Sequence, residues 1–259
     1  MSIVYSLVFV FILIFIIQVF FFAIAAVFKT DKVTDLAYGL SFVVVAWYEL
    51  FKNNLFNPFS VILVAMVSVW GFRLAIYLFY RILKIKKDSR FNEIRSNFVK
   101  LAGFWIIQTV SIFIISLAYV VFFEVFDPTD KISVVYTAIG FLIWVLGFSI
   151  EAISDKQKWA YLSSGGKKWI DSGLWKYSRH PNYFGEILCW VGIYVYTLSS
   201  TGITHFYTML SPIFITLLLL FFSGIPLLEK AQDEKFGNDT DYINYKKNTS
   251  LLIIWPPKS

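Results

Sequence analysis

The stretch GLWKYSRHPNYFGEILCW, residues 173–190, passes directly from a basic, polar loop into an apolar segment. Pro181 fits the first turn of a helix, where its missing backbone N–H is not needed, so the sequence predicts a helix that begins there. In that helix Asn182, Tyr183 and Glu186 lie on one face, because they are three and four residues apart. The mouth of this helix therefore presents an amide, a phenol and a carboxylate together.

Arg179 and His180 come just before the predicted helix, near its positive end, where anions are favoured. An arginine in front of a membrane helix is also a common topology signal, and tyrosine and tryptophan often anchor helices at the interface. Glu186 differs from these, because an ionisable residue inside a membrane segment indicates a function by default. We interpret the stretch as part of a ligand site.

The composition indicates an integral membrane protein. Only 15% of the 259 residues are charged, whereas a soluble domain carries about a quarter. Several apolar runs reach the roughly 20 residues that span a bilayer. The formal net charge is +6, and because the basic residues gather in alternate loops we read it as a topology signal and expect no nucleic-acid partner. One cysteine and two histidines, far apart in the chain, predict neither an intrachain disulfide nor a metal site.

The expected fold is an all-α, multi-pass membrane bundle that forms a single domain over residues 1–259. Basic residues concentrate in loops 29–32, 84–100, 156–179 and 230–258, so the positive-inside rule places these loops and the C-terminus in the cytoplasm, with the N-terminus outside. The first apolar run is interpreted as a retained span, because it lacks the basic start of a cleaved signal. Seven spans are predicted, at residues 3–28, 33–51, 59–83, 101–123, 133–153, 182–199 and 206–226.

Local patterns predict several contacts and breaks. Gln18 and Gln108 are expected to form hydrogen bonds between helices, as such residues usually do in membranes. The run Gly224-Ile225-Pro226 predicts a kink or an end of the last span. Tyr242 and Tyr245 share a face if the polar tail is helical.

Two segments on the cytoplasmic side have open interpretations. Residues 161–173 are predicted to form a loop by their Gly and Ser content. Within it, Gly165-Gly166 followed by Lys167-Lys168 fits either a phosphate-binding turn or, more commonly, a flexible basic loop. Trp255 is expected to anchor the tail at the membrane surface.

Five runs in the chain resemble the steroid 5-alpha-reductase family, in particular its microbial-type branch, which is related to the isoprenylcysteine carboxyl methyltransferase-like membrane fold. Together they cover most of the chain from Trp70 onward. RHP alone occurs in membrane methyltransferases too, but HPNYFGE with the other runs in order is specific. The runs are WGFRLAIYLFYR at 70–81, EAISDKQ at 151–157, GLWKYSRHPNYFGE at 173–186, SGIPLLE at 223–229 and DYINYKKNTSLLIIWPPK at 241–258.

The resemblance implies an NADPH-dependent reductase of a carbon–carbon double bond conjugated to a carbonyl, in a lipophilic, steroid- or isoprenoid-like substrate. Hydride addition at the beta carbon builds charge on the carbonyl oxygen, which requires a preorganised donor. In the family an acid in the second span and a tyrosine in a later span hold that oxygen. The resemblance therefore implies Glu49 with Tyr77 or Tyr80 as the catalytic residues.

The C-terminal half, residues 133–259, is implied to bind the cofactor, with a site that opens to the cytoplasm. The host membrane is either a bacterial inner membrane or the endoplasmic reticulum, and membrane lipid and a lipophilic small molecule are the expected partners. The implied cofactor-binding residues are Asp155, Arg179, His180, Asn182, Tyr183, Glu186, Glu229, Tyr242 and Tyr245.

Two other functions share these features. An S-adenosylmethionine-dependent membrane methyltransferase of a lipid or prenyl group would use the RHP run and the later glutamate, and would also open to the cytoplasm. A non-enzymatic lipid or sterol carrier would keep only the fold. Stabilisation of the purified protein by NADPH or by S-adenosylmethionine discriminates between the two enzymes.

Overall fold

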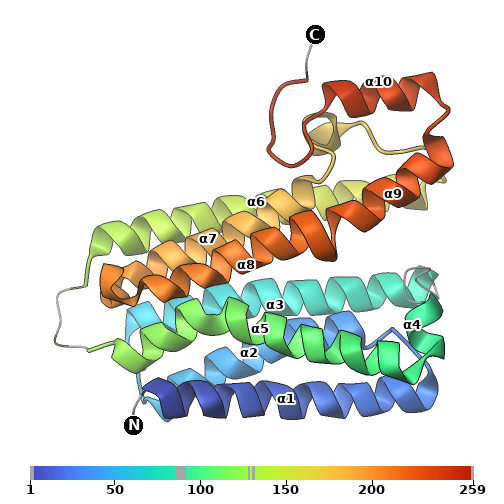
Figure 1. Cartoon of the computed structure of the whole chain (residues 1–259). Coiled ribbons are helices and arrows are strands. Elements are labelled where there is room, and N and C mark those ends of the chain that lie inside the picture. Colours follow the sequence, from blue (N-terminus) through green and yellow to red (C-terminus); the bar gives the residue numbers. More distant parts are fainter. Residues whose placement is uncertain (1–2, 86–91, 128, 130–131, 258–259) are drawn as a thin grey trace. The chain divides into compact units, whose positions relative to one another are not determined.

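The structure, a computed structural model, describes residues 3–85, 92–127, 129 and 132–257, and most of these residues are helical. Part of the second basic loop, residues 86–91, and Lys258 of the last run lie outside these residues. No strand occurs within them, which confirms the all-α prediction. In chain order (Figure 1) the helices are α1 (Ile3–Phe28), α2 (Thr34–Lys52), α3 (Pro58–Ile85), α4 (Asn92–Ser96), α5 (Phe98–Val125), α6 (Val134–Ser163), α7 (Pro181–Thr201), α8 (Leu210–Leu217), α9 (Ile225–Phe236) and α10 (Thr240–Asn248).

The molecule is a membrane protein with several helices that can cross a bilayer. Among the described residues, five helical stretches are long and apolar enough: Ile3–Phe28, Pro58–Lys84, Phe98–Val125, Val134–Ser163 and Phe206–Phe236. The other two predicted spans, 33–51 and 182–199, coincide with α2 and α7, which are shorter and more polar helices. The count of seven spans and the orientation of the termini stay predictions.

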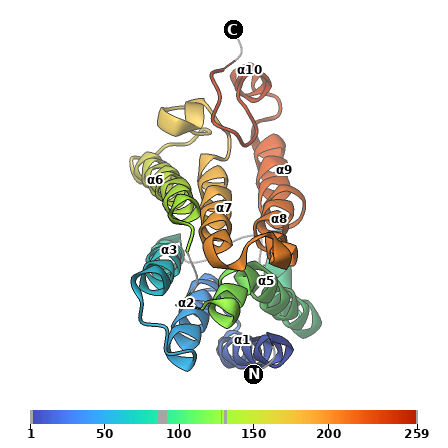
Figure 2. The ribbon, with the colours of Figure 1, turned by 90° about the vertical axis from the view of Figure 1, so that its left-hand side faces the viewer.

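The helices form two compact units. The first comprises Met1–Thr137 and Ile193–Ser211, and the second comprises Ala138–Gly192 and Pro212–Ser259. In the first unit α2 packs along α3, and α5 packs along α1 and α2, as the end-on view in Figure 2 shows. The second unit contains most of α6, the first half of α7, most of α8, and all of α9 and α10. It coincides largely with the region predicted to bind the cofactor.

A buried chain of amides ties α1, α2 and α5 together in the first unit. The Gln108 Nε2 donates to Gln18 Oε1 at 2.9 Å, and the Gln18 Nε2 donates to Ser41 Oγ at 2.8 Å. All three side chains are buried. The predicted interhelical role of Gln18 and Gln108 is confirmed, because an amide within an apolar bundle must find its partners on neighbouring helices.

Glycines set the close approach of α6 and α7 in the second unit. A Cβ atom at Gly185 of α7 would lie 2.5 Å from the backbone nitrogen of Glu151 and 2.6 Å from the carbonyl oxygen of Gly147. A Cβ atom at Gly192 would lie 2.5 Å from the backbone nitrogen of Trp144. Such distances are shorter than any packed Cβ contact, so only glycine allows the two backbones to come this near.

The ends of the second unit's helices match the sequence signals, with one exception. The helix α7 begins at Pro181 as predicted, and a π-helical turn (Leu218–Phe222) and Gly224 separate α8 from α9 at the predicted break. The helix α6 is longer than the predicted span and ends at Ser163, so residues 161–163 are helical and the prediction of a loop there is wrong. The hydrogen bond from the Ser164 N–H to the carbonyl of Ala160 continues the helical pattern to the first glycine.

We predict that Gly185→Ala lowers the free energy of unfolding by about 1–3 kcal/mol, because the added methyl group must push α6 and α7 apart. Thermal unfolding of the solubilised protein measures this. The matched control is Gly103→Ala in α5, where a Cβ atom meets nothing within 4 Å and the better helix propensity of alanine adds up to about 1 kcal/mol. A Gly185→Ala variant that melts with the parent would contradict the tight α6–α7 contact.

Candidate functional site

The Gly-Leu-Trp turn docks the central motif onto the end of α6. Gly173 has a φ of +62°, a left-handed conformation that favours glycine, and a Cβ atom there would lie 2.5 Å from the Gln157 amide. The Leu174 N–H donates to Gln157 Oε1 at 3.0 Å, and the Trp175 Nε1 donates to the Ser154 carbonyl at 3.1 Å. These contacts fix the loop that leads to Arg179 and His180.

The C-terminal tail holds the other edge of the same loop. Three hydrogen bonds join the two segments, in a pairing that resembles a short parallel β-bridge between Ser178 and Ser250. They run from the Arg179 N–H to the Ser250 carbonyl at 2.8 Å, from the Ser178 hydroxyl to the Leu252 carbonyl at 2.7 Å, and from the Trp255 N–H to the Tyr177 carbonyl at 3.2 Å. Segments about 75 residues apart in the sequence therefore form one structure.

An aromatic cluster packs α10 onto this loop. The Trp169 ring lies 5.2 Å from the Tyr242 ring and 6.2 Å from the Tyr245 ring, so the two tyrosines share a face of α10 as predicted. The Tyr245 hydroxyl donates to the Trp175 carbonyl at 2.8 Å, and the Tyr242 hydroxyl donates to Asp233 at 2.8 Å. Burial raises the pKa of both phenols well above their usual value, so both stay neutral hydrogen-bond donors.

Glu229 of α9 is the hub of the site. Its Oε2 lies 2.8 Å from Arg179 Nη1 and 3.2 Å from Lys246 Nζ, and its Oε1 lies 2.8 Å from His180 Nε2. One carboxylate therefore contacts two consecutive residues of the loop before α7, Arg179 and His180, and one residue of α10, Lys246. Glu229 was expected to bind the cofactor, and its oxygens are already taken by three protein donors.

The tautomer of His180 follows from this contact. The side chain is only 5% exposed, and burial lowers its pKa, an effect that the Glu229 carboxylate opposes only in part. The ring is then neutral near pH 7. Since a carboxylate can only accept, the hydrogen is on Nε2, and Nδ1 keeps its lone pair.

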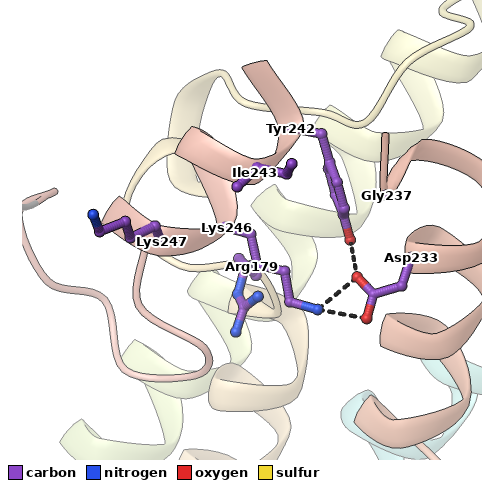
Figure 3. A pocket seen from close by; sticks show the side chains of 7 residues that line it. All are labelled: Arg179, Asp233, Gly237, Tyr242, Ile243, Lys246 and Lys247. Carbon is purple, nitrogen blue, oxygen red and sulfur yellow. Dashed lines mark hydrogen bonds and ion pairs between the residues drawn. The ribbon is translucent and has the colours of Figure 1, made fainter. Parts of the chain in front are cut away.

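A hollow of about 550 Å³ opens beside this hub. Figure 3 shows the Lys246 Nζ and the Tyr242 hydroxyl both pointing at the Asp233 carboxylate, with Arg179 below them. The Nε of Arg179 is buried and has no hydrogen-bond partner among the described residues. The hollow is lined by Arg179, Asp233, Gly237, Tyr242, Ile243, Lys246 and Lys247.

The sequence prediction missed three charged members of this site, Asp233, Lys246 and Lys247, and also Gly237 and Ile243. A signal for two of them is present, because Glu229 and Asp233 are one turn apart on α9, and Tyr242 and Lys246 are one turn apart on α10. When two consecutive helices carry acids at this spacing on one and hydrogen-bond donors at this spacing on the other, the two faces can be expected to pair.

The remaining predicted cofactor residues lie in the second unit but are spread over α6 and α7. The Tyr183 ring stacks on the His180 ring, with centroids 5.7 Å apart, and its edge lies against Gly224. Asn182 is half-buried beside it. Glu186, one turn deeper in α7, and Asp155 of α6 are each 8% exposed.

The predicted catalytic trio is not brought together. Glu49 lies at the end of α2, where Lys52 Nζ is 3.7 Å from its Oε2 and 2.5 Å from Glu124 Oε1. Trp47, two residues before Glu49, donates a hydrogen bond to Ser68, which marks the depth of this part of α2 on α3. Tyr77 and Tyr80 lie nine and twelve residues beyond Ser68. At 1.5 Å per residue these are about 14 and 18 Å along the α3 axis. The structure does not place Glu49 beside either tyrosine, because residues of neighbouring antiparallel helices share a depth only when they lie equally far from the connecting turn, and their catalytic role stays a prediction.

We predict that the pKa of His180 lies below the usual value of about 6.5, and that histidine NMR of a His205→Asn variant, which keeps a single imidazole, detects this. A lowered folded pKa means that the unfolded chain binds more protons. The contribution of neutral His180 to stability is then complete above the unfolded pKa and is lost as pH falls through the folded pKa. His180→Gln should melt with a smaller pH dependence than the parent between about pH 8 and about pH 5. An imidazole that titrates above its usual value would contradict this assignment.

Comparisons with known proteins agree with the membrane-reductase resemblance at the level of family. No curated protein and no solved structure matches the chain. A family model described as "Protein of unknown function (DUF1295)" matches residues 21–249, which is most of the chain. The chain therefore belongs to the DUF1295 family, which is a steroid 5-alpha-reductase-like family.

Proposed function

We propose that the protein is a membrane-embedded, NADPH-dependent reductase of a carbon–carbon double bond conjugated to a carbonyl, in a lipophilic steroid- or isoprenoid-like substrate. The observation that supports it most is the cation-lined hollow beside Glu229, within a chain whose family is steroid 5-alpha-reductase-like. We call the loop before α7 together with α9, α10 and the tail the polar head. A water-soluble cofactor suits this polar head, and the apolar spans suit a substrate that arrives through the bilayer.

The residues of the hollow fit a phosphate-bearing nucleotide. Arg179, Lys246 and Lys247 line it, and the nearby carboxylates are Asp233 and Glu229. Three cations against two anions leave an excess of positive charge, and the free Nε of Arg179 is a buried donor that lacks an acceptor. Phosphate oxygens satisfy such donors, and a guanidinium binds them with fixed geometry.

The same charge balance favours a polyanion over S-adenosylmethionine. The sulfonium of S-adenosylmethionine is positive, and it gains nothing from a lining that already holds Arg179, Lys246 and Lys247. NADPH carries a pyrophosphate and an additional 2′-phosphate. The methyltransferase alternative therefore has less support from the geometry than the reductase.

The protein's own residues act by holding and orienting. Arg179 and the two lysines would hold the phosphates of NADPH, which when bound supplies the hydride. Glu229 orients Arg179. It also fixes the His180 ring through Nε2, so the contact with Glu229 does not use the Nδ1 lone pair. Tyr242 is turned toward Asp233 and helps to position that acid between Lys246 and the aromatic cluster. The donor for the substrate carbonyl stays a prediction, and the pairing of Glu49 with Tyr77 or Tyr80 is not part of the proposal.

We predict that NADPH raises the melting temperature of the parent more than NADH does, and that Lys247→Ala weakens NADPH binding by about three- to tenfold, the loss of one partly exposed charge-assisted contact. Thermal unfolding with each nucleotide measures the first effect, and titration calorimetry in detergent measures the second. Lys235→Ala is the matched control, because Lys235 lies on α9 over the Phe236 ring and does not line the hollow. Equal affinity of the parent for both nucleotides, or binding of S-adenosylmethionine alone, would contradict the proposal.

A further inference from the structure

The C-terminal tail that clasps the motif has one apolar edge turned outward. From Leu251 to Trp255 exposure alternates residue by residue: Leu251, Ile253 and Trp255 are 37%, 56% and 68% exposed, whereas Leu252 and Ile254 are half-buried. An alternation of period two is the signature of an extended segment with two different faces. The outward face consists of three large apolar side chains.

The inner edge of the tail is fully engaged, which fixes that alternation. The Ser250 and Leu252 carbonyls accept hydrogen bonds from the Arg179 N–H and the Ser178 hydroxyl, and the Trp255 N–H donates to Tyr177. The tail therefore cannot rotate to bury its apolar face against the second unit without breaking these bonds. Leu251, Ile253 and Trp255 are therefore available to a partner outside the second unit.

The chemistry beside this face is that of a membrane interface. A shallow hollow of about 410 Å³ at the surface of the second unit is lined by Lys247, Asn248, Thr249, Ser250, Leu251, Ile253, Trp255 and Pro256. Tryptophan and lysine next to aliphatic side chains are typical of segments at the boundary between headgroups and acyl chains. The long stem of a lysine there lies along apolar surface while its ammonium stays in water.

The position of the tail within the second unit agrees with this chemistry. Figure 1 shows the tail at the left-hand end of α10. The helix α6 also begins on the left, and its apolar part lies in that direction. The far, polar end of α6 carries Lys156 and Lys158. A bilayer surface that crosses α6 between these two parts would pass near the tail.

We propose that the face formed by Leu251, Ile253 and Trp255 docks into the headgroup–acyl boundary of the bilayer that holds the spans. The bilayer then anchors the tail that holds the loop of Arg179 and His180, so the membrane surface helps to keep the candidate site assembled. This proposal does not depend on which cofactor the polar head binds, or on whether the protein is an enzyme.

A cysteine scan of the tail tests the docking surface in the full chain. In a Cys189→Ala background, single variants Leu251→Cys, Leu252→Cys, Ile253→Cys, Ile254→Cys and Trp255→Cys carry a spin label, and the protein is reconstituted in phospholipid nanodiscs. Collision with oxygen, which enters lipid, is compared with collision with a water-soluble nickel chelate. Glu234→Cys is the matched control, since Glu234 of α9 is exposed at the surface of the same head.

At positions 251, 253 and 255 we expect high oxygen and low nickel accessibility, with lower oxygen accessibility at 252 and 254. At position 234 we expect high nickel accessibility. Nickel accessibility at 253 and 255 equal to that at 234 would overturn the proposal, and so would the absence of alternation along the tail. Because positions 253 and 255 make no side-chain hydrogen bond in the described structure, their labelled forms remain informative even if the variants at 252 or 254 disturb the clasp.

Discussion

The second unit depends on a single carboxylate, Glu229, which faces three donors from two separate segments. Arg179 and His180 come from the loop before α7, and Lys246 comes from α10. Without Glu229, Arg179 would lose its ion pair in a half-buried place, whereas Lys246 would keep its contacts with Asp233, so the loop would lose its charged link to α9 and α10. The contact is therefore a condition for placing the loop, α9 and α10 together.

The rest of the unit supplies the geometry that makes this contact possible. Glycine contacts set α7 close to α6, and the turn at Gly173 binds the loop to the end of α6. The break at Gly224 starts α9 as a new helix, which puts Glu229 one turn from its beginning. The tail closes the loop from the other side. Arg179, Lys246 and Lys247 then line one side of a shared hollow, where an anionic ligand would be favoured.

Much of this arrangement could be predicted from the sequence, because local signals were strong. A proline at a helix start, a glycine before a proline at a break, and two tyrosines three residues apart each express backbone geometry that tertiary packing did not override. Gln18 and Gln108 were predictable for a different reason: an amide in an apolar helix has few places to find a partner.

The remainder depends on contacts that no local pattern encodes. That Lys246 and Asp233 lie beside Arg179 depends on how α9, α10 and the loop fold back on each other. Glu49 was grouped with Tyr77 and Tyr80 by resemblance, without regard to their depth along α3. The loop expected from residue 161 begins three residues later, because serine is tolerated in the last turn of a helix when its own hydroxyl or backbone closes the turn.

Hydrogen exchange of a Glu229→Gln variant tests most directly whether this carboxylate holds the site together. We expect the amides of Arg179 and Trp255, which bond the loop to the tail, to exchange about tenfold faster or more, while α1, α2 and α5 keep their protection. Glu234→Gln, an exposed neutral replacement on the same helix, should leave all of these rates unchanged. Unchanged protection in residues 177–180 and 250–255 of Glu229→Gln would contradict the account.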